Sequence, residues 1–457
     1  MYKTNTKWMV SAIYLATLVT AIESTIVVTA TRSIVSDLGS ANLTSLIFAT
    51  YLFSSALATP IFGRLADNYG KKRIFQIGLL LFLLGTILCG FSISSWMLFG
   101  SRVIQGIGAG GIMPMTFALI GELFDISTRG KIMGLNNSAW GIASLIAPLI
   151  GGLILKQLTW HWIFFINVPI VLIVLLIVQI SYKEKRPQTI SQKGTFHQYT
   201  YLIAGLLLLL SGIQLFSTYF LLGTVILIAG LFVLLFFYRQ EKKEHDPILP
   251  ISTMTIYDFS LLTICVFLIN GALIGFQVYL PMWIQTELHL SPTSAGLALL
   301  PSSLFFILGS YYSGKLLNRF GQKLLLQLIV GGALLGFLSL SVLPGNTGYM
   351  VLLIFSSLLG FFIGTGVTIS VITAQAYATQ QNLSTVSGFI TLCRTLGQSF
   401  MVTFLGVINQ RIFLLKHLQL AGYHSVYLTI SIIFILLLFL VSHRPTVNPH
   451  EQKNEVS

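Results

Sequence analysis

The sequence predicts an all-α membrane protein with fourteen transmembrane helices, arranged as two six-helix bundles with two further helices inserted between them. The first observation is composition: of 457 residues, 55% are hydrophobic and only 9% are charged, whereas soluble domains carry about 25% charged residues. The second is a recurrence of long apolar runs, and the third is a ten-residue pattern that occurs twice. Such a chain cannot cover a water-exposed surface, which excludes soluble enzymes and nucleic-acid-binding proteins.

Each apolar run has about the 20 residues that a helix needs to cross the hydrocarbon core of a bilayer. The runs cover 9–33, 43–62, 74–94, 96–121, 132–154, 162–182, 199–218, 220–238, 259–284, 294–313, 324–343, 349–373, 385–408 and 425–442. The first run resembles a signal peptide, but it is too long and lacks a small-residue cleavage site, so we interpret it as an uncleaved span.

These runs divide the chain into four parts. We predict an N-terminal six-span bundle at 1–183, a C-terminal six-span bundle at 259–443 and a cytoplasmic tail at 444–457. The segment 184–258 between the bundles holds a cytoplasmic loop, the two inserted spans (the seventh and eighth) and a linker.

The net charge of +13 comes from Lys and Arg residues whose distribution along the chain indicates its orientation in a membrane. With the N-terminus inside, 20 of the 26 Lys and Arg residues fall in cytoplasmic segments, and only Lys156, Arg411 and Lys416 lie outside. Cytoplasmic loops of membrane proteins carry this excess of basic residues. We therefore predict a multi-pass protein of the cell membrane with both termini cytoplasmic. The lipid bilayer is its expected partner, and we expect no binding of nucleic acid.

Two glycine patterns resemble nucleotide-binding motifs but lack their context. The segment from Gly106 to Gly111 fits G-x-G-x-x-G, yet it lies inside the fourth span with no preceding strand, so we interpret it as a helix-packing surface. The segment from Gly309 to Lys315 nearly forms a P-loop but is followed by Leu316. Three distant cysteines and no closely spaced histidine pair indicate neither a disulfide framework nor a metal site. We expect no cofactor, no metal and no ATP.

The ten-residue pattern relates the two halves of the chain. Gly63-Arg-Leu-Ala-Asp-Asn-Tyr-Gly-Lys-Lys72 and Gly314-Lys-Leu-Leu-Asn-Arg-Phe-Gly-Gln-Lys323 align at an offset of 251 residues, and each copy follows the second span of its six-span block. Repeated halves of this kind are the basis of alternating access in secondary transporters.

Four segments carry a resemblance to a known family. The segment from Gly63 to Arg73 resembles motif A of the major facilitator superfamily, and Arg102-Val-Ile-Gln-Gly106-Ile-Gly-Ala-Gly110 resembles its motif B. The segment from Trp140 to Gly152 is similar to motif C, which is associated with drug/proton antiporters. The run Trp160-His-Trp-Ile-Phe-Phe-Ile-Asn-Val-Pro169 is similar to the W-R-W-I-F-x-I-N-V-P run of the fourteen-span, EmrB/QacA-like antiporters.

This resemblance implies the major facilitator fold and a proton-coupled antiporter that exports lipophilic or cationic drugs by alternating access. It implies no enzymatic activity, the proton gradient as the only energy source, and a functional monomer. A dedicated exporter of one metabolite or antibiotic is the alternative. A channel or a membrane enzyme is a remote alternative, because the sequence contains neither a pore-lining repeat nor a catalytic cluster.

Glu23 and Arg102 are the candidate proton-coupling residues. Glu23 lies deep in the first span, where a charge is costly and is by default functional. At ~1.5 Å per residue, Glu23 is about 21 Å from the inner end of its span and Arg102 about 9 Å from the outer end of the fourth, which in a core of ~30 Å is the same layer. A buried ion pair that only fixes helix packing is the alternative interpretation.

Motifs A and C suggest further roles. In motif A the resemblance implies a conformational latch of Gly63, Asp67, Gly70, Lys71 and Arg73, in which Asp67 and the basic residues form ion pairs and Glu122 is a further partner. In motif C, Pro148 kinks the fifth span, and Gly141, Gly151 and Gly152 let a neighbouring helix approach and seal the cytoplasmic half of the pathway. Ala147, also part of this motif, replaces the family's glycine before the proline. Polar and aromatic residues on the spans expected to line the cavity are candidate pocket residues: Tyr51, Trp140, Asn270, Gln277, Tyr279, Gln375 and Arg394.

Overall fold

The structure, a computed structural model, describes residues 5–38, 44–184, 196–216, 219–244, 247, 249–290, 292–379, 381–416 and 419–443. All regular secondary structure in these residues is helical. The long helices are α1 (Thr6–Leu38), α2 (Thr44–Tyr69), α3 (Lys71–Gly90), α4 (Ser95–Leu123), α5 (Ile126–Gln157), α7 (Asn167–Ser181), α8 (Phe196–Phe216), α9 (Phe220–Glu241), α11 (Tyr257–Thr286), α13 (Leu300–Phe320), α14 (Gln322–Leu340), α15 (Tyr349–Ala376), α16 (Leu383–Lys416) and α17 (Gln419–Ser442). Three short helices are α6 (Trp162–Phe165), α10 (Ile251–Met254) and α12 (Pro292–Leu297).

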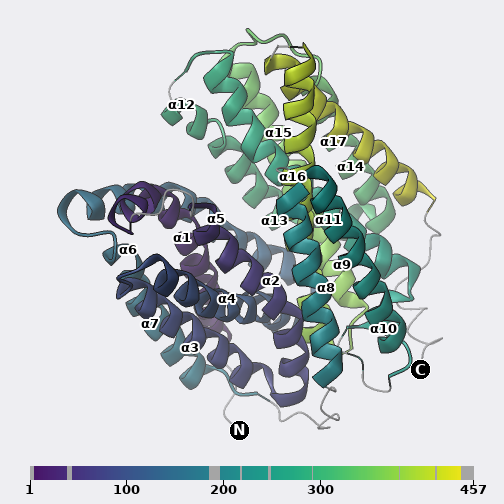
Figure 1. Ribbon diagram of the computed structural model, residues 1–457. Coiled ribbons are helices and arrows are strands. Elements are labelled where there is room, and N and C mark those ends of the chain that lie inside the picture. The colour runs from purple at the N-terminus through teal and green to yellow at the C-terminus, as the bar shows by residue number, and fades with distance from the viewer. Residues whose placement is uncertain are drawn as a thin grey trace.

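The helices form two bundles and one inserted pair. Helices α1 to α7 make up the N-terminal bundle and α11 to α17 the C-terminal bundle (Figure 1). Helices α8 and α9 pack on each other, and α8 lies against α2 and α16, so the inserted pair sits beside the junction of the bundles. The tail at 444–457 lies outside the described residues.

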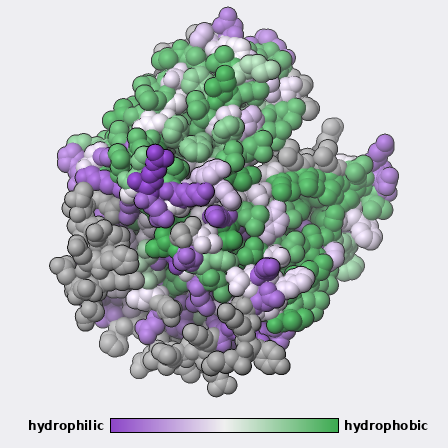
Figure 2. All heavy atoms as spheres, turned by 180° about the vertical axis from the view of Figure 1, so that it is seen from behind, coloured by the Kyte–Doolittle hydropathy of each residue, from purple (hydrophilic) through white to green (hydrophobic). Residues whose placement is uncertain are grey.

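Apolar composition drives these helices into lipid. Eleven helical segments among the described residues are long and apolar enough to cross a membrane, and α8 contains a shorter apolar stretch at Tyr199–Ile213. Broad apolar areas cover the surface seen in Figure 2. On α9 a row of large side chains is exposed, including Leu221 at 80% and Phe232 at 70%, as expected for a helix surrounded by lipid rather than by water.

Both copies of the ten-residue pattern continue a helix instead of forming a loop. Residues 63–69 belong to α2 and residues 314–320 to α13, and only Gly70 and Gly321 separate these helices from α3 and α14. Both glycines have positive φ, at 96° and 72°, a backbone conformation that disfavours side chains. The spans predicted at 43–62 and 74–94 therefore leave too long a connection between them, because α2 continues to Tyr69, α3 begins at Lys71 and the chain needs just one residue to turn.

The bundles contact each other at the end of the molecule where Gly70 and Gly321 lie, called here the Gly70 end. A Cβ atom on Gly63 of α2 would lie 2.7 Å from the carbonyl oxygen of Ser384 on α16, and a Cβ on Gly130 of α5 would lie 2.8 Å from the nitrogen of Gly314 on α13. Toward the opposite end the ribbons of the two bundles diverge (Figure 1). The structure is thus closed at the Gly70 end.

Glycines of α4 bring three helices of the N-terminal bundle together. A Cβ on Gly108 would lie 2.2 Å from the nitrogen of Phe82 on α3, and one on Gly110 would lie 2.4 Å from the carbonyl oxygen of Ser55 on α2. The G-x-G-x-x-G pattern is therefore confirmed as a packing surface. Its close contacts hold α4, and with it Arg102, against α2 and α3.

Candidate functional site

Glu23 of α1 and Arg102 of α4 form an ion pair inside the N-terminal bundle. Arg102 Nη1 lies 2.5 Å from Glu23 Oε1, and both side chains are fully buried. The structure thus brings the two residues together, as their estimated depths predicted. Replacing a buried ion pair by apolar residues often costs little, whereas removing one partner leaves an unpaired buried charge and costs about 3–5 kcal/mol.

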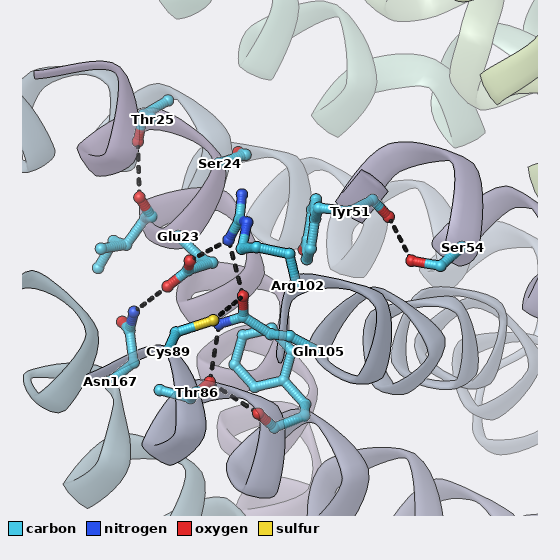
Figure 3. A network of polar contacts seen from close by, with 12 residues as sticks. Glu23, Ser24, Thr25, Tyr51, Ser54, Thr86, Cys89, Arg102, Gln105 and Asn167 are labelled. Atoms are coloured by element: carbon cyan, nitrogen blue, oxygen red, sulfur yellow. Dashed lines mark hydrogen bonds and ion pairs between the residues drawn. The ribbon is translucent and has the colours of Figure 1, made fainter. Parts of the chain in front are cut away.

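Side chains from α3, α4 and α7 complete the coordination of this pair (Figure 3). Asn167 Nδ2 donates to Glu23 Oε2 at 2.6 Å, so both carboxylate oxygens have a donor. Arg102 Nη1 also donates to Gln105 Oε1 at 2.7 Å, and Gln105 Nε2 donates to Thr86 Oγ1 at 2.8 Å. Sequence reasoning did not assign Gln105 or Asn167 a role, although both stand as polar residues within apolar runs that carry the family resemblance.

Tyr51 of α2 covers the guanidinium group instead of lining an open pocket. Arg102 Cζ lies 4.5 Å from the centre of the Tyr51 ring, and Tyr51 is buried. A cation over an aromatic face is stabilised by the ring quadrupole. The four helices α1, α2, α4 and α7 therefore meet at one charged cluster, and a proton that binds Glu23 would neutralise the only carboxylate in it.

Asp67 connects the two bundles, but not through the ion pairs that were expected. Its carboxylate oxygens accept hydrogen bonds from the backbone N–H groups of Ser384 at 3.0 Å and Thr385 at 2.7 Å, in the first turn of α16. The first N–H groups of a helix lack partners within it and attract negative charge. The predicted partners Lys71, Lys72 and Arg73 are on α3, which begins after the turn at Gly70 and does not supply the ligands of Asp67.

Lys71 instead pairs with Glu122. Lys71 Nζ lies 2.6 Å from Glu122 Oε2 at the end of α4, and Tyr182 Oη donates to Glu122 Oε1 at 3.0 Å. Glu122 is thus a partner of the motif A basic residues, as predicted, and Lys71 is the one that it binds. Arg73 is exposed on α3. This ion pair ties α3 to α4 within the N-terminal bundle.

Glu184, which sequence reasoning did not single out, binds the first turn of α3. Its carboxylate accepts hydrogen bonds from the backbone nitrogen of Lys71 and, at 3.1 Å, from that of Lys72. A Cβ atom on Gly70 would lie 2.5 Å from Glu184 Oε2. Burial raises the pKa of Glu184 above its ordinary value of 4.5, while the two N–H groups oppose that rise. Glycine at position 70 therefore leaves space for a carboxylate as well as allowing the turn.

Two motif C glycines, Gly141 and Gly152, do not make the close approach expected of them. A Cβ on Gly141 would meet side chains of α13 only at 3.6 Å or more, and Gly152 faces open space. Ala147 and Gly151 are buried, and the side chain of Pro148 lies outside the described residues. The close contact between α5 and α13 occurs nearer the Gly70 end, at Gly130 and Gly134, because there the two bundles touch.

Most of the candidate pocket residues are packed within helices. Asn270 and Tyr279 are buried in the C-terminal bundle, where Asn270 Nδ2 donates to the Val266 carbonyl at 2.8 Å. Gln375 belongs to the closed Gly70 end, because its Nε2 donates to the Phe117 carbonyl on α4 at 3.1 Å and to Ser387 Oγ at 3.0 Å. The prediction that these three line a cavity is wrong for this conformation.

Three candidate pocket residues remain partly accessible, namely Trp140, Gln277 and Arg394. Trp140 packs on an apolar cluster built from α1, α3, α4, α5 and α6. No group of three or more potential metal-ligating side chains occurs among the described residues.

Comparison with known proteins gives a consistent result. The family model described as Major Facilitator Superfamily matches residues 13–199 and 199–402. The chain is 30% identical over 418 residues to Multidrug resistance protein 3 of Bacillus subtilis, covering 90% of this chain and 80% of that protein. It is 34% identical over 327 residues to the multidrug efflux pump SdrM of Staphylococcus aureus, covering 69% and 70%.

Solved structures show the same fold. The human organic anion transporter MFSD10 (TETRAN) superposes with a TM-score of 0.72 at 15% identity, over 96% of this chain and 100% of that chain. FucP in the outward conformation superposes with a TM-score of 0.65 at 14% identity, over 95% and 98%.

Proposed function

Because the chain belongs to the Major Facilitator Superfamily, a family of membrane transporters rather than enzymes, we propose that it is a proton-coupled antiporter that exports lipophilic and cationic drugs from the cytoplasm. The single observation that carries the proposal is the buried carboxylate of Glu23, which is held by Arg102 and Asn167. The efflux relatives support export as the direction of transport.

The proton is proposed to act by breaking the ion pair. When Glu23 is ionised, Arg102 and Asn167 hold α1, α4 and α7 together. When an oxygen of Glu23 takes a proton, the charge attraction is lost while Arg102 keeps its bond to Gln105 and its place over Tyr51. Since Glu23 is fully buried in this conformation, a proton reaches it only when the surrounding helices move, which links protonation to alternating access.

The latch is proposed to oppose that movement. Asp67 bonds the first turn of α16 while the bundles are closed at the Gly70 end. On this proposal the Gly70 end is cytoplasmic, and its opening to admit a drug requires both hydrogen bonds to break. Asp67 then sets the free-energy difference between the two conformations.

The test of proton coupling is drug-induced proton release from the purified protein in detergent. We expect Glu23→Gln to bind a neutral drug but to release no proton and to lose export driven by a pH gradient. Glu23→Asp should retain part of the activity, because the carboxylate is kept one carbon shorter. Glu244→Gln, which alters an exposed carboxylate, is the matched control. If Glu23→Gln releases as many protons as the parent, the coupling acid lies elsewhere, at Asp258 or Glu287.

The proposed topology has fourteen spans, an EmrB/QacA-like arrangement, with both termini cytoplasmic. The start of α1 and the end of α7 lie together, since the Asn5 nitrogen donates to the Ser181 carbonyl at 3.1 Å. The end of α17 lies beside α14, where Gln327 Nε2 donates to Ser442 Oγ at 3.1 Å. Membrane-impermeant labelling from outside should fail at cysteines introduced next to Lys185 and Lys242, and labelling at either site would contradict this topology.

A further inference from the structure

The two bundles differ in how they balance charge within the membrane. In the N-terminal bundle the buried guanidinium of Arg102 is paired with Glu23. In the C-terminal bundle Arg394 lies in the first half of α16, and the acidic residues from α11 to α17 are Asp258 and Glu287. Asp258 lies in the first turn of α11, where it accepts a hydrogen bond from Tyr377 at 2.9 Å. Glu287 is at the other end of the bundle, directly after the last residue of α11. Neither of these carboxylates forms an ion pair with Arg394.

No ion pair or hydrogen bond joins Arg394 to another residue in the part of the chain that the structure describes. The side chain is nevertheless half-buried. Arginine does not lose its proton in proteins, so the charge persists. An uncompensated charge inside a membrane protein is costly and marks a functional site. The described residues therefore supply no counter-charge for Arg394.

The phase of α16 places Arg394 on the side of the helix that faces the junction of the bundles. Ser387, seven residues or two turns earlier, shares this side and accepts a hydrogen bond from Gln375, which also bonds α4 of the other bundle. The opposite side of α16 carries Leu392 and Leu396, which pack with side chains of α8 and α9. Arg394 is therefore not directed toward the inserted helices or the lipid behind them.

The depth of Arg394 places it just beyond the closed region. Eleven residues separate it from Leu383 (394 − 383), the start of α16, which is about 17 Å along the helix in a core of ~30 Å. The last glycine contact between α16 and α2 is at Gly388, whose Cβ would lie 3.1 Å from the Thr59 carbonyl oxygen. Arg394 is thus about two turns past that contact, where the bundles begin to diverge.

We propose that Arg394 binds the carboxylate of lipophilic cargo, so that the protein accepts zwitterionic and acidic drugs in addition to cations. This inference rests on the proposed export function and extends its substrate class. A guanidinium group matches a carboxylate with two parallel hydrogen bonds, and the apolar surroundings of α16 favour the lipophilic part of the same molecule. The positive charge of the cargo, where present, then faces the N-terminal bundle.

The test compares two dyes that differ in one group. Rhodamine B carries a free carboxylate beside its delocalised cation, and its ethyl ester carries the cation alone. Binding of both dyes to the purified, non-energised protein is measured by fluorescence anisotropy. Because a hydrogen bond to a charged group contributes about 1.5–3 kcal/mol, we expect Arg394→Gln to weaken rhodamine B binding about tenfold or more. Binding of the ester should change by less than about twofold.

Two further variants separate binding from structure. Arg394→Lys keeps the charge but loses the planar fork, so its affinity for rhodamine B should fall between those of the parent and Arg394→Gln. Arg239→Gln removes the same charge from an exposed position at the end of α9 and should affect neither dye. Thermal unfolding of each variant verifies that its fold is intact.

The possible outcomes differ in what they overturn. Equal weakening of both dyes in Arg394→Gln, or no weakening of either, overturns the carboxylate site. A parent that binds the ester but not rhodamine B overturns the carboxylate site and leaves the proposed export function standing. A parent that binds neither dye counts against the drug-export function as well.

Discussion

The two copies of the ten-residue pattern have nearly the same backbone but different surroundings. Gly70 and Gly321 both turn the chain between two helices at positive φ. A Cβ atom at Gly70 would meet Glu184, whereas nothing lies within 4 Å of one at Gly321. Asp67 binds α16, whereas its counterpart Asn318 is exposed. Both copies begin with a glycine that packs against the other bundle, Gly63 against α16 and Gly314 against α5, but only the first copy adds polar contacts at its Asp67 and Gly70 positions.

This difference shows that a repeat preserves backbone geometry more strictly than function. The turn requires only glycine, which both copies have. The latch requires a carboxylate within reach of a free helix N-terminus, and only the first copy has one. Alternating access does not need two equal latches, since a single pair of hydrogen bonds suffices to bias one conformation against the other.

The largest predicted effect is a loss of thermal stability when Gly70 is replaced. Gly70→Ala introduces backbone strain of about 1–2 kcal/mol and also displaces Glu184 from the first turn of α3, which costs about 1–2 kcal/mol more. Gly321→Ala introduces the strain alone. The thermal unfolding midpoint of the purified protein should therefore fall roughly twice as far for the first variant as for the second.

A double mutant isolates the contribution of Glu184. In a Glu184→Ala background, Gly70→Ala should cost no more than Gly321→Ala does, because the steric conflict has been removed. Equal midpoints for the two single variants would show that the carboxylate beside Gly70 contributes nothing to stability.

The second effect concerns Asp67. Asp67→Asn keeps one acceptor but loses the charge, and a hydrogen bond to a charged group contributes about 1.5–3 kcal/mol. The closed conformation should be disfavoured by about tenfold, and export of rhodamine B ethyl ester should slow. Accessibility of a cysteine introduced at Ser384 to a thiol reagent measures the closed fraction. Asn318→Ala is the matched control in the second copy, and an equal change in that variant would refute an asymmetric latch.

The smallest effect is a pH dependence at Glu184. Because its pKa is raised in the folded protein, its contribution to stability is fully present below about pH 4.5 and is lost as the pH rises through the raised value. The midpoint of the parent should therefore decline relative to that of Glu184→Gln as the pH increases from about 4.5 to neutrality. Glu244→Gln, at an exposed carboxylate, should show no such relative change, and a parallel response of all three proteins would contradict the assignment.

The sequence by itself determined the membrane class, the repeat and the Glu23–Arg102 pair. These depend on length, periodicity and depth, which are properties of each helix taken alone: a carboxylate and a guanidinium at the same depth of adjacent spans have few other partners in apolar surroundings. The packing role of the α4 glycines was predictable because they lie inside a membrane span with no preceding strand, where small residues let helices approach closely. The resemblance to motif A likewise identified Asp67, Gly70 and Glu122 as important residues without identifying their contacts.

Only the tertiary structure decided which groups those residues meet. Asp67 binds backbone N–H groups 317 and 318 residues away, and an unpaired backbone donor leaves no trace in a sequence, because every helix begins with such donors. Glu184 follows the last helix of its bundle and reaches α3 only because α7 and α3 lie side by side. Gln375 was expected in a pocket and lies instead in the contact between bundles. Its position depends on which end of the molecule is closed, and that is a property of the whole assembly of helices rather than of any one of them.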